Sequence, residues 1–142
     1  FFRFGARGTG KTTLLRELIE QPEQVRSVKF DLLDTKLELK LQRQPERLRR
    51  EIERVKPHWV IIDEVQKAPK LLDHVHQLIE ETDVKFALTG SSARKLKRGS
   101  ANLLVGRAFV FHLFPLTHVE LGADFDLPDV LHWGGAASTY FE

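Results

Sequence analysis

The sequence predicts an α/β fold in which a parallel β-sheet of about five strands carries helices on both faces. Three observations predict this fold class. Short apolar runs alternate with segments of helical pattern, as in sheets whose strands are joined by helices. A glycine-rich turn links the first apolar run to the first helical segment. An acidic pair directly follows another apolar run, Trp59 to Ile62.

Composition places the chain among ordinary water-soluble globular proteins, with 42% hydrophobic and 30% charged residues in a length of 142. The net charge of +2 is too small to indicate a nucleic-acid or membrane partner by itself. No apolar run approaches the roughly 18 residues of a membrane span, and no leader pattern is present. We therefore expect a cytoplasmic protein with no membrane partner. Because the chain lacks methionine and starts inside a predicted strand, we also expect it to be a fragment.

The first helix is expected from about Gly10 to Gln21, because leucine and isoleucine recur there at helical spacing before Pro22. Residues Val25–Leu33 alternate and then run apolar, which predicts the second strand. The stretch Thr35–Gln42 alternates leucine with charged residues. It fits either an extended edge or the end of an amphipathic helix, and the pattern leaves both open.

A further helix is predicted to start at Pro45 and to end at Pro57, with apolar residues at helical spacing between them. The apolar run Trp59–Ile62 is typical of a central parallel strand. The predicted order continues with a helix at about Pro69–Glu81 and strands at Val84–Leu88 and Ala108–Leu113. Thr117 or Asp126 could cap short helices beyond the last strand.

The run from Gly5 to Thr12 fits a phosphate-binding P-loop between a strand and a helix. Its glycines let backbone N–H groups turn toward phosphate oxygens, Lys11 reaches the outer phosphates, and Thr12 offers a hydroxyl ligand for magnesium. A merely structural glycine turn has no use for Lys-Thr at its exit. The residues expected to bind nucleotide here are Gly5, Ala6, Arg7, Gly8, Thr9, Gly10, Lys11, Thr12 and Thr13.

Asp63 and Glu64 supply what nucleotide hydrolysis needs beside such a loop. In this interpretation Asp63 is a metal ligand, directly or through water, and Glu64 polarises the attacking water. The alternative is that an acidic pair only marks the solvent end of a strand. Asp63 lies 52 residues after Lys11, which leaves room for a helix, a strand and another helix between the two sites. We expect the Lys11-Thr12 tip and the Asp63-Glu64 tip to lie side by side.

Four blocks in one order resemble the prokaryotic AAA-type ATPases, which often carry a C-terminal domain of unassigned role. The blocks are residues 5–15, 60–69, 87–96, and 104–108 with 114–121. The resemblance implies an ATPase that uses ATP and Mg²⁺, strand order 5-1-4-3-2, and Asp63-Glu64 as the Walker B pair. It implies a P-loop ATPase core over residues 1–122. Residues 123–142 are then the start of a helical or C-terminal region that is truncated or gapped.

The resemblance also implies a sensor role at the end of the strand between the two tips, where Thr89 or Ser91 would read the γ-phosphate or hold water. Arg107 is the first candidate for stabilising transition-state charge, and Arg94 is the second. Whether that arginine acts in its own site or in a neighbour's stays open, and the second case requires a homo-oligomer.

The predicted function is Mg²⁺-dependent ATP hydrolysis that drives an unidentified process. The alternative is a nucleotide-dependent binding or switch module with little hydrolysis, in contact with DNA or a protein partner. Arg47, Arg49 and Arg50, with the basic stretch 94–98, could contact a nucleic-acid backbone, although solvated surface charge is the commoner explanation. A GTPase is disfavoured because the chain has no Asn-Lys-x-Asp element.

Overall fold

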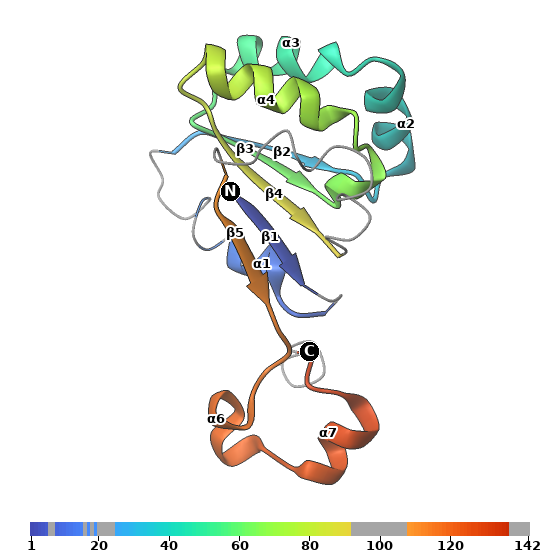
Figure 1. The fold of residues 1–142 in the computed structure, drawn as a ribbon, viewed down its shortest axis with the longest axis vertical. Helices are drawn as coiled ribbons and strands as arrows, with labels where there is room; N and C mark the ends of the chain where they lie inside the picture. Colours follow the sequence, from blue (N-terminus) through green and yellow to red (C-terminus); the bar gives the residue numbers. More distant parts are fainter. Residues whose placement is uncertain (6–7, 16, 18, 20–24, 92–107, 137–142) are drawn as a thin grey trace.

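The computed structural model describes residues 1–5, 8–15, 17, 19, 25–91 and 108–136. Its centre is one five-stranded sheet in the order β2-β3-β4-β1-β5, and every neighbouring pair is parallel (Figure 1). Read from the opposite edge, this is the predicted order 5-1-4-3-2. The strands are β1 (Phe2–Gly5), β2 (Ser27–Asp31), β3 (Trp59–Asp63), β4 (Lys85–Gly90) and β5 (Val110–Leu113).

Helices cover both faces of this sheet, which confirms the predicted three layers (Figure 1). Helix α1 (Lys11–Leu15) packs on one face, where Leu15 and Ile19 meet Ile61 and Ala87. The other face carries α2 (Thr35–Arg43), α3 (Glu46–Val55) and α4 (Leu71–Glu81). The larger core lies there and contains the buried apolar residues of these three helices together with most of those of β1 to β4.

The stretch Thr35–Gln42, whose pattern fitted either a strand or a helix, lies in helix α2. The N-terminal cap of this helix explains the outcome. The Asp34 carboxylate accepts from Lys36 N at 2.8 Å and from Leu37 N at 3.4 Å, so it satisfies donors that a helix start leaves unpaired. Leu41 is buried, Leu37 is half-buried and Leu39 is exposed. The alternating leucines therefore do not mark a strand; only part of the pattern faces the core.

Other predicted elements differ from the structure only at their ends, and two short 3-10 helices, one after β3 and one after β5, were not predicted. Strand β2 is shorter than Val25–Leu33, and β4 runs on to Gly90. The short 3-10 helix η2 (Val65–Lys67) was not predicted; Val65 and Ala68 anchor it in the core. The second half of the predicted first helix lies mostly outside the described residues.

Beyond the sheet edge, β5 leads into a small helical segment that extends away from the sheet (Figure 1). Both predicted caps are present. Thr117 forms a reciprocal capping box with Glu120 at α6 (His118–Leu121), and these hydrogen bonds hold the pKa of the Glu120 carboxyl below its usual value. Asp126 caps α7 (Leu127–Trp133), after the 3-10 helix η4 (Gly122–Asp124).

The sheet holds β5 tightly against the strand that enters the phosphate loop. Gly5 is the register partner of Leu113, and a Cβ on Gly5 would lie 2.4 Å from the Leu113 carbonyl oxygen. Only glycine fits at this approach. Among the described helices, none is both long enough and apolar enough to cross a bilayer.

Candidate active site

The candidate site lies where β1, β3 and β4 end, at the carboxyl edge of the parallel sheet (Figure 1). Side chains that follow parallel strands meet at this edge, because all the strands point the same way. Strand β1 leads into the phosphate loop, β3 ends at Asp63, and β4 lies between them and ends at Gly90. The predicted place of the sensor strand between the two tips is therefore observed.

Two glycines in the described part of the loop have a backbone that other residues rarely adopt. Gly8 and Gly10 have φ of 77° and 78°, in the left-handed region that glycine enters without steric cost. The side chain of Lys11 is buried and its Nζ donates to the Gly5 carbonyl at 2.8 Å. The lysine ammonium is therefore held at the end of β1.

The two predicted tips meet through a direct hydrogen bond. Thr12 Oγ1 donates to Asp63 Oδ2 at 3.0 Å, although the two residues lie far apart in the chain. Asp63 is only 5% exposed. A hydroxyl and a carboxylate at this separation can both turn toward one small cation, and oxygen ligands of this kind suit Mg²⁺. The residues present therefore fit the metal that the sequence predicts.

Thr89 fixes the aspartate from the middle strand. It is fully buried, and its hydroxyl donates to Asp63 Oδ1, which also accepts from Glu64 N at 3.1 Å. Both oxygens of Asp63 are thus engaged by donors, which offsets the cost of burying its charge. The Thr89 hydroxyl bonds Asp63, whereas the hydroxyl of Ser91, two residues later in the chain, bonds Glu64.

Glu64 has an unusual backbone for a residue other than glycine. Its φ and ψ are 55° and 44°, the left-handed helical region, which costs such residues roughly 1–2 kcal/mol. The carboxylate is nearly buried and accepts from Ser91 Oγ at 3.0 Å and Ser91 N at 3.3 Å. Gln66 Nε2 also donates to it.

Gln66 is the residue of this site that sequence reasoning missed. It sits in the run Asp-Glu-Val-Gln-Lys, two positions after the acidic pair, and received no role. The available signal was an amide close to a predicted water-polarising carboxylate, but the unpredicted η2 turn is what brings the two together.

Not every predicted site residue can be placed. Ala6, Arg7, Arg94 and Arg107 lie outside the described residues. Thr9 is buried in the loop and Thr13 is exposed on α1. The structure brings together five of the predicted side chains, those of Thr12, Asp63, Glu64, Thr89 and Ser91, in two linked groups.

Fold and site together define the class: a P-loop NTPase domain in which β1, the strand that enters the loop, is flanked by β4 and β5. The chain belongs to the family described as AAA domain, which matches residues 2–122. This membership confirms the resemblance drawn from the four sequence blocks. No curated protein sequence matches the chain.

Two solved structures share this fold with the chain. The Orc1 protein of Aeropyrum pernix, solved in complex with DNA, has a TM-score of 0.68 at 16% identity, over 96% of this chain and 50% of that one. Domain III of the Thermotoga maritima replication initiation protein DnaA has a TM-score of 0.54 at 17% identity, over 84% of this chain and 56% of that one. The chain thus spans about half the length of each; at these identities the likeness shows the fold alone.

Proposed function

We propose that this protein hydrolyses ATP with Mg²⁺. The observation that carries the proposal is the hydrogen bond between Thr12 and Asp63, since it joins the phosphate loop to the acidic strand end. Glu64, the next residue after Asp63, is then close enough to act on a water at the same triphosphate. Membership of the AAA domain family supports a nucleotide as the ligand.

Each residue has a separate task in this proposal. Lys11 leaves the Gly5 carbonyl and neutralises the outer phosphates; Gly8 and Gly10 let the loop backbone face them. Thr12 and Asp63 hold Mg²⁺, which when bound neutralises charge on phosphate oxygens. Glu64 orients the attacking water and takes up its proton. Thr89 keeps Asp63 in place, and the Ser91 hydroxyl, which donates to Glu64, would hold the water or read the γ-phosphate.

Phosphate release from ATP tests this assignment. Lys11→Ala should abolish turnover together with ATP binding, and Glu64→Gln should retain ATP binding while the turnover number falls about 10²- to 10⁴-fold. Gln77→Ala, at an exposed position on α4, is a matched control that should turn over as the wild type does. Equal rates for wild type, Lys11→Ala and Glu64→Gln would show that this site does not hydrolyse ATP.

The competing proposal is a binding or switch module that retains ATP. Tight ATP binding with no phosphate release over hours would favour it. Glu64 argues for hydrolysis, because a module that only binds does not require a buried carboxylate held by three donors in a left-handed backbone.

A second candidate function, contact with nucleic acid, has one observation in its favour. A hollow of about 400 Å³ lies between β2, α2 and α3, and its lining includes five cationic side chains and one carboxylate. Arg54 pairs with that carboxylate, Glu51, and holds its pKa below the usual value. The cations are Lys29, Lys40, Arg47, Arg50 and Arg54.

Salt-dependent binding to a DNA duplex tests this candidate. Phosphate contacts release counterions, so removing Lys40 and Arg50 together should weaken binding and lower the salt slope by about two. Binding that is insensitive to both changes would exclude the hollow as a DNA contact.

We propose in addition that residues 1–122 form the ATPase core, since the family match ends there. Residues 123–142 would begin a further region, and a self-assembled state would let Arg107 or Arg94 act on a neighbouring copy.

A further inference from the structure

The Glu64 carboxylate is held unequally at its two oxygens. Oε2 accepts from Gln66 Nε2, from Ser91 Oγ at 3.0 Å and from Ser91 N at 3.3 Å. Within the part of the chain that the structure describes, no donor is paired with Oε1. Three donors converging on one oxygen restrict rotation of the carboxylate, and the second oxygen stays available.

Gln66 is suited to this task because a primary amide has two donors. One N–H bonds Glu64 Oε2, and Nε2 also donates to Ser91 Oγ at 3.1 Å. The serine hydroxyl in turn donates to Glu64. The three side chains therefore form a closed ring of hydrogen bonds in which Gln66 links the ends of β3 and β4.

The turn that follows Glu64 brings Gln66 back over the carboxylate. The left-handed backbone at Glu64 starts η2, and Lys67 N donates to the Glu64 carbonyl at 3.0 Å. Val65 and Ala68 are buried and fix this turn from below. The left-handed backbone at Glu64 thus lets the side chains of Glu64 and Gln66 meet.

Gly90, the last residue of strand β4, leaves the space that the Gln66 amide occupies. A Cβ on Gly90 would lie 2.6 Å from Gln66 Oε1, so the amide packs where any larger residue would need the space. Gln66 Oε1 is itself buried and has no hydrogen-bond partner among the described residues. An unpaired buried acceptor is unfavourable for stability, which indicates that the amide is placed for its N–H groups rather than for the fold.

We propose that Gln66, seated on Gly90, is a positioning residue for ATP hydrolysis: it locks one oxygen of Glu64 so that the other faces the attacking water. This inference rests on the proposed ATPase function. Because Gln66 acts through Glu64, it should govern the turnover number and leave ATP affinity unchanged.

A set of variants measured for ATP turnover and for binding of a fluorescent ATP analogue tests the proposal. Gln66→Ala should lower the turnover number about 10- to 100-fold, with affinity within about threefold. Gly90→Ala should have a similar effect, since its methyl group displaces the amide. The double variant should be no slower than Gln66→Ala alone, because both changes remove the same contact. In a Glu64→Gln background, Gln66→Ala should change the residual rate by less than about threefold.

The control is another glutamine attached to the same turn. Gln42 Nε2 donates to the Lys67 carbonyl at 2.7 Å, so Gln42→Ala loosens η2 without touching Glu64. Its turnover should stay within about twofold of wild type. A loss as large as that of Gln66→Ala would mean that rigidity of the turn, and not the amide, is what matters.

Three further outcomes would overturn the positioning role. In the first, Gln66→Ala turns over ATP at the wild-type rate; in the second, its ATP affinity falls as much as its turnover; in the third, it costs as much in the Glu64→Gln background as alone. In each of these cases the wild type still hydrolyses ATP and the proposed function stands. A wild-type chain that binds ATP without hydrolysing it overturns both proposals.

Discussion

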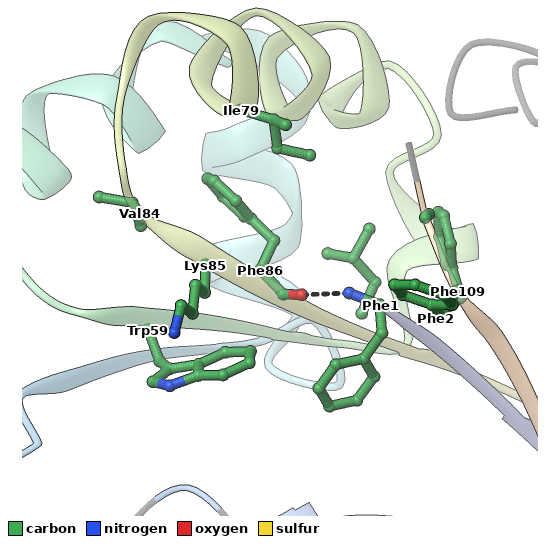
Figure 2. A pocket seen from close by; sticks show the side chains of 10 residues that line it. Phe1, Phe2, Trp59, Ile79, Val84, Lys85, Phe86 and Phe109 are labelled. Atoms are coloured by element: carbon green, nitrogen blue, oxygen red, sulfur yellow. Dashed lines mark hydrogen bonds between the residues drawn. The ribbon is translucent and has the colours of Figure 1, made fainter. Parts of the chain in front are cut away.

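The two ends of the parallel sheet are built from the same strands and differ in almost every other respect. At the carboxyl end, β3 and β4 lead into the buried polar residues Asp63, Glu64 and Thr89. The Thr89 hydroxyl donates to the Asp63 carboxylate and accepts from the Glu64 backbone N–H. At the amino end, the same two strands start at Trp59 and Lys85 beside a hollow of about 330 Å³. Figure 2 shows this hollow, with aromatic rings around it and the Phe1 amine donating to the Phe86 carbonyl.

The two ends of the sheet therefore hold their side chains by different kinds of interaction. At the carboxyl end, charges are buried and must be paired, so each side chain there is held by directional hydrogen bonds. At the amino end, ring contacts such as that of Phe1 with Trp59, centroids 5.7 Å apart, contribute packing that needs little directionality. Changes at the amino end should therefore alter stability, whereas changes at the carboxyl end should alter turnover.

The largest effect is expected from Phe86→Ala. Phe86 is 4% exposed in the larger core, so its truncation should lower the free energy of unfolding by about 3–5 kcal/mol. Urea unfolding measures this loss. Phe109→Ala, at a residue of the same hollow that is 79% exposed, is the matched control and should change stability by less than about 0.5 kcal/mol. Turnover per folded molecule should match wild type in both, and a specific loss of turnover in Phe86→Ala would break the division between the ends.

Asp63→Asn should give the next largest effect, on turnover. The amide keeps an acceptor for Thr89 and Glu64 N but loses the charge that would hold Mg²⁺, so turnover should fall about 10²- to 10³-fold, roughly 3–4 kcal/mol. Stability in urea without nucleotide should change by less than about 1 kcal/mol. Raising the Mg²⁺ concentration should partly restore the rate, as it should not for Glu64→Gln. Unchanged turnover would remove Asp63 from the metal site.

Lys85→Gln should give the smallest effect. Lys85 Nζ lies 5.7 Å from the centre of the Trp59 ring, and such a contact at an exposed position stabilises by about 0.5–1 kcal/mol. Thermal unfolding followed by tryptophan fluorescence should show a loss of that order, and Lys85→Arg should show little or none. A change in ATP turnover with Lys85→Gln would contradict a purely structural role for the amino end.

Much of this arrangement was predictable because local chemistry determined it. The Lys-Thr exit of a glycine loop and an acidic pair after an apolar strand each have few uses, so the meeting of Thr12 with Asp63 followed from both. The strand order came from the resemblance and agrees with the structure. Whether the stretch after Asp34 was strand or helix was not predictable from leucine spacing alone, because the pattern fitted both and the cap decided it.

The part of the site that could not be predicted depends on contacts between distant residues. Gln66 reaches Glu64 only because a 3-10 turn follows a left-handed backbone, and neither leaves a periodic pattern in the sequence. Thr89 and Ser91 were predicted as a pair of alternatives. Their division between Asp63 and Glu64 depends on the register of β4, which places Leu88 beside Ile62.

The close approach of β5 to Gly5 would let a movement of the helical segment after β5 reach the phosphate loop. Residues 114–136 are attached directly after Leu113, which lies against Gly5 with no room for an added methyl group. The carbonyl of that glycine is the acceptor of the Lys11 ammonium. A displacement of the helical segment along β5 would thus reach the lysine through two contacts, without passing through the sheet's hydrophobic layers.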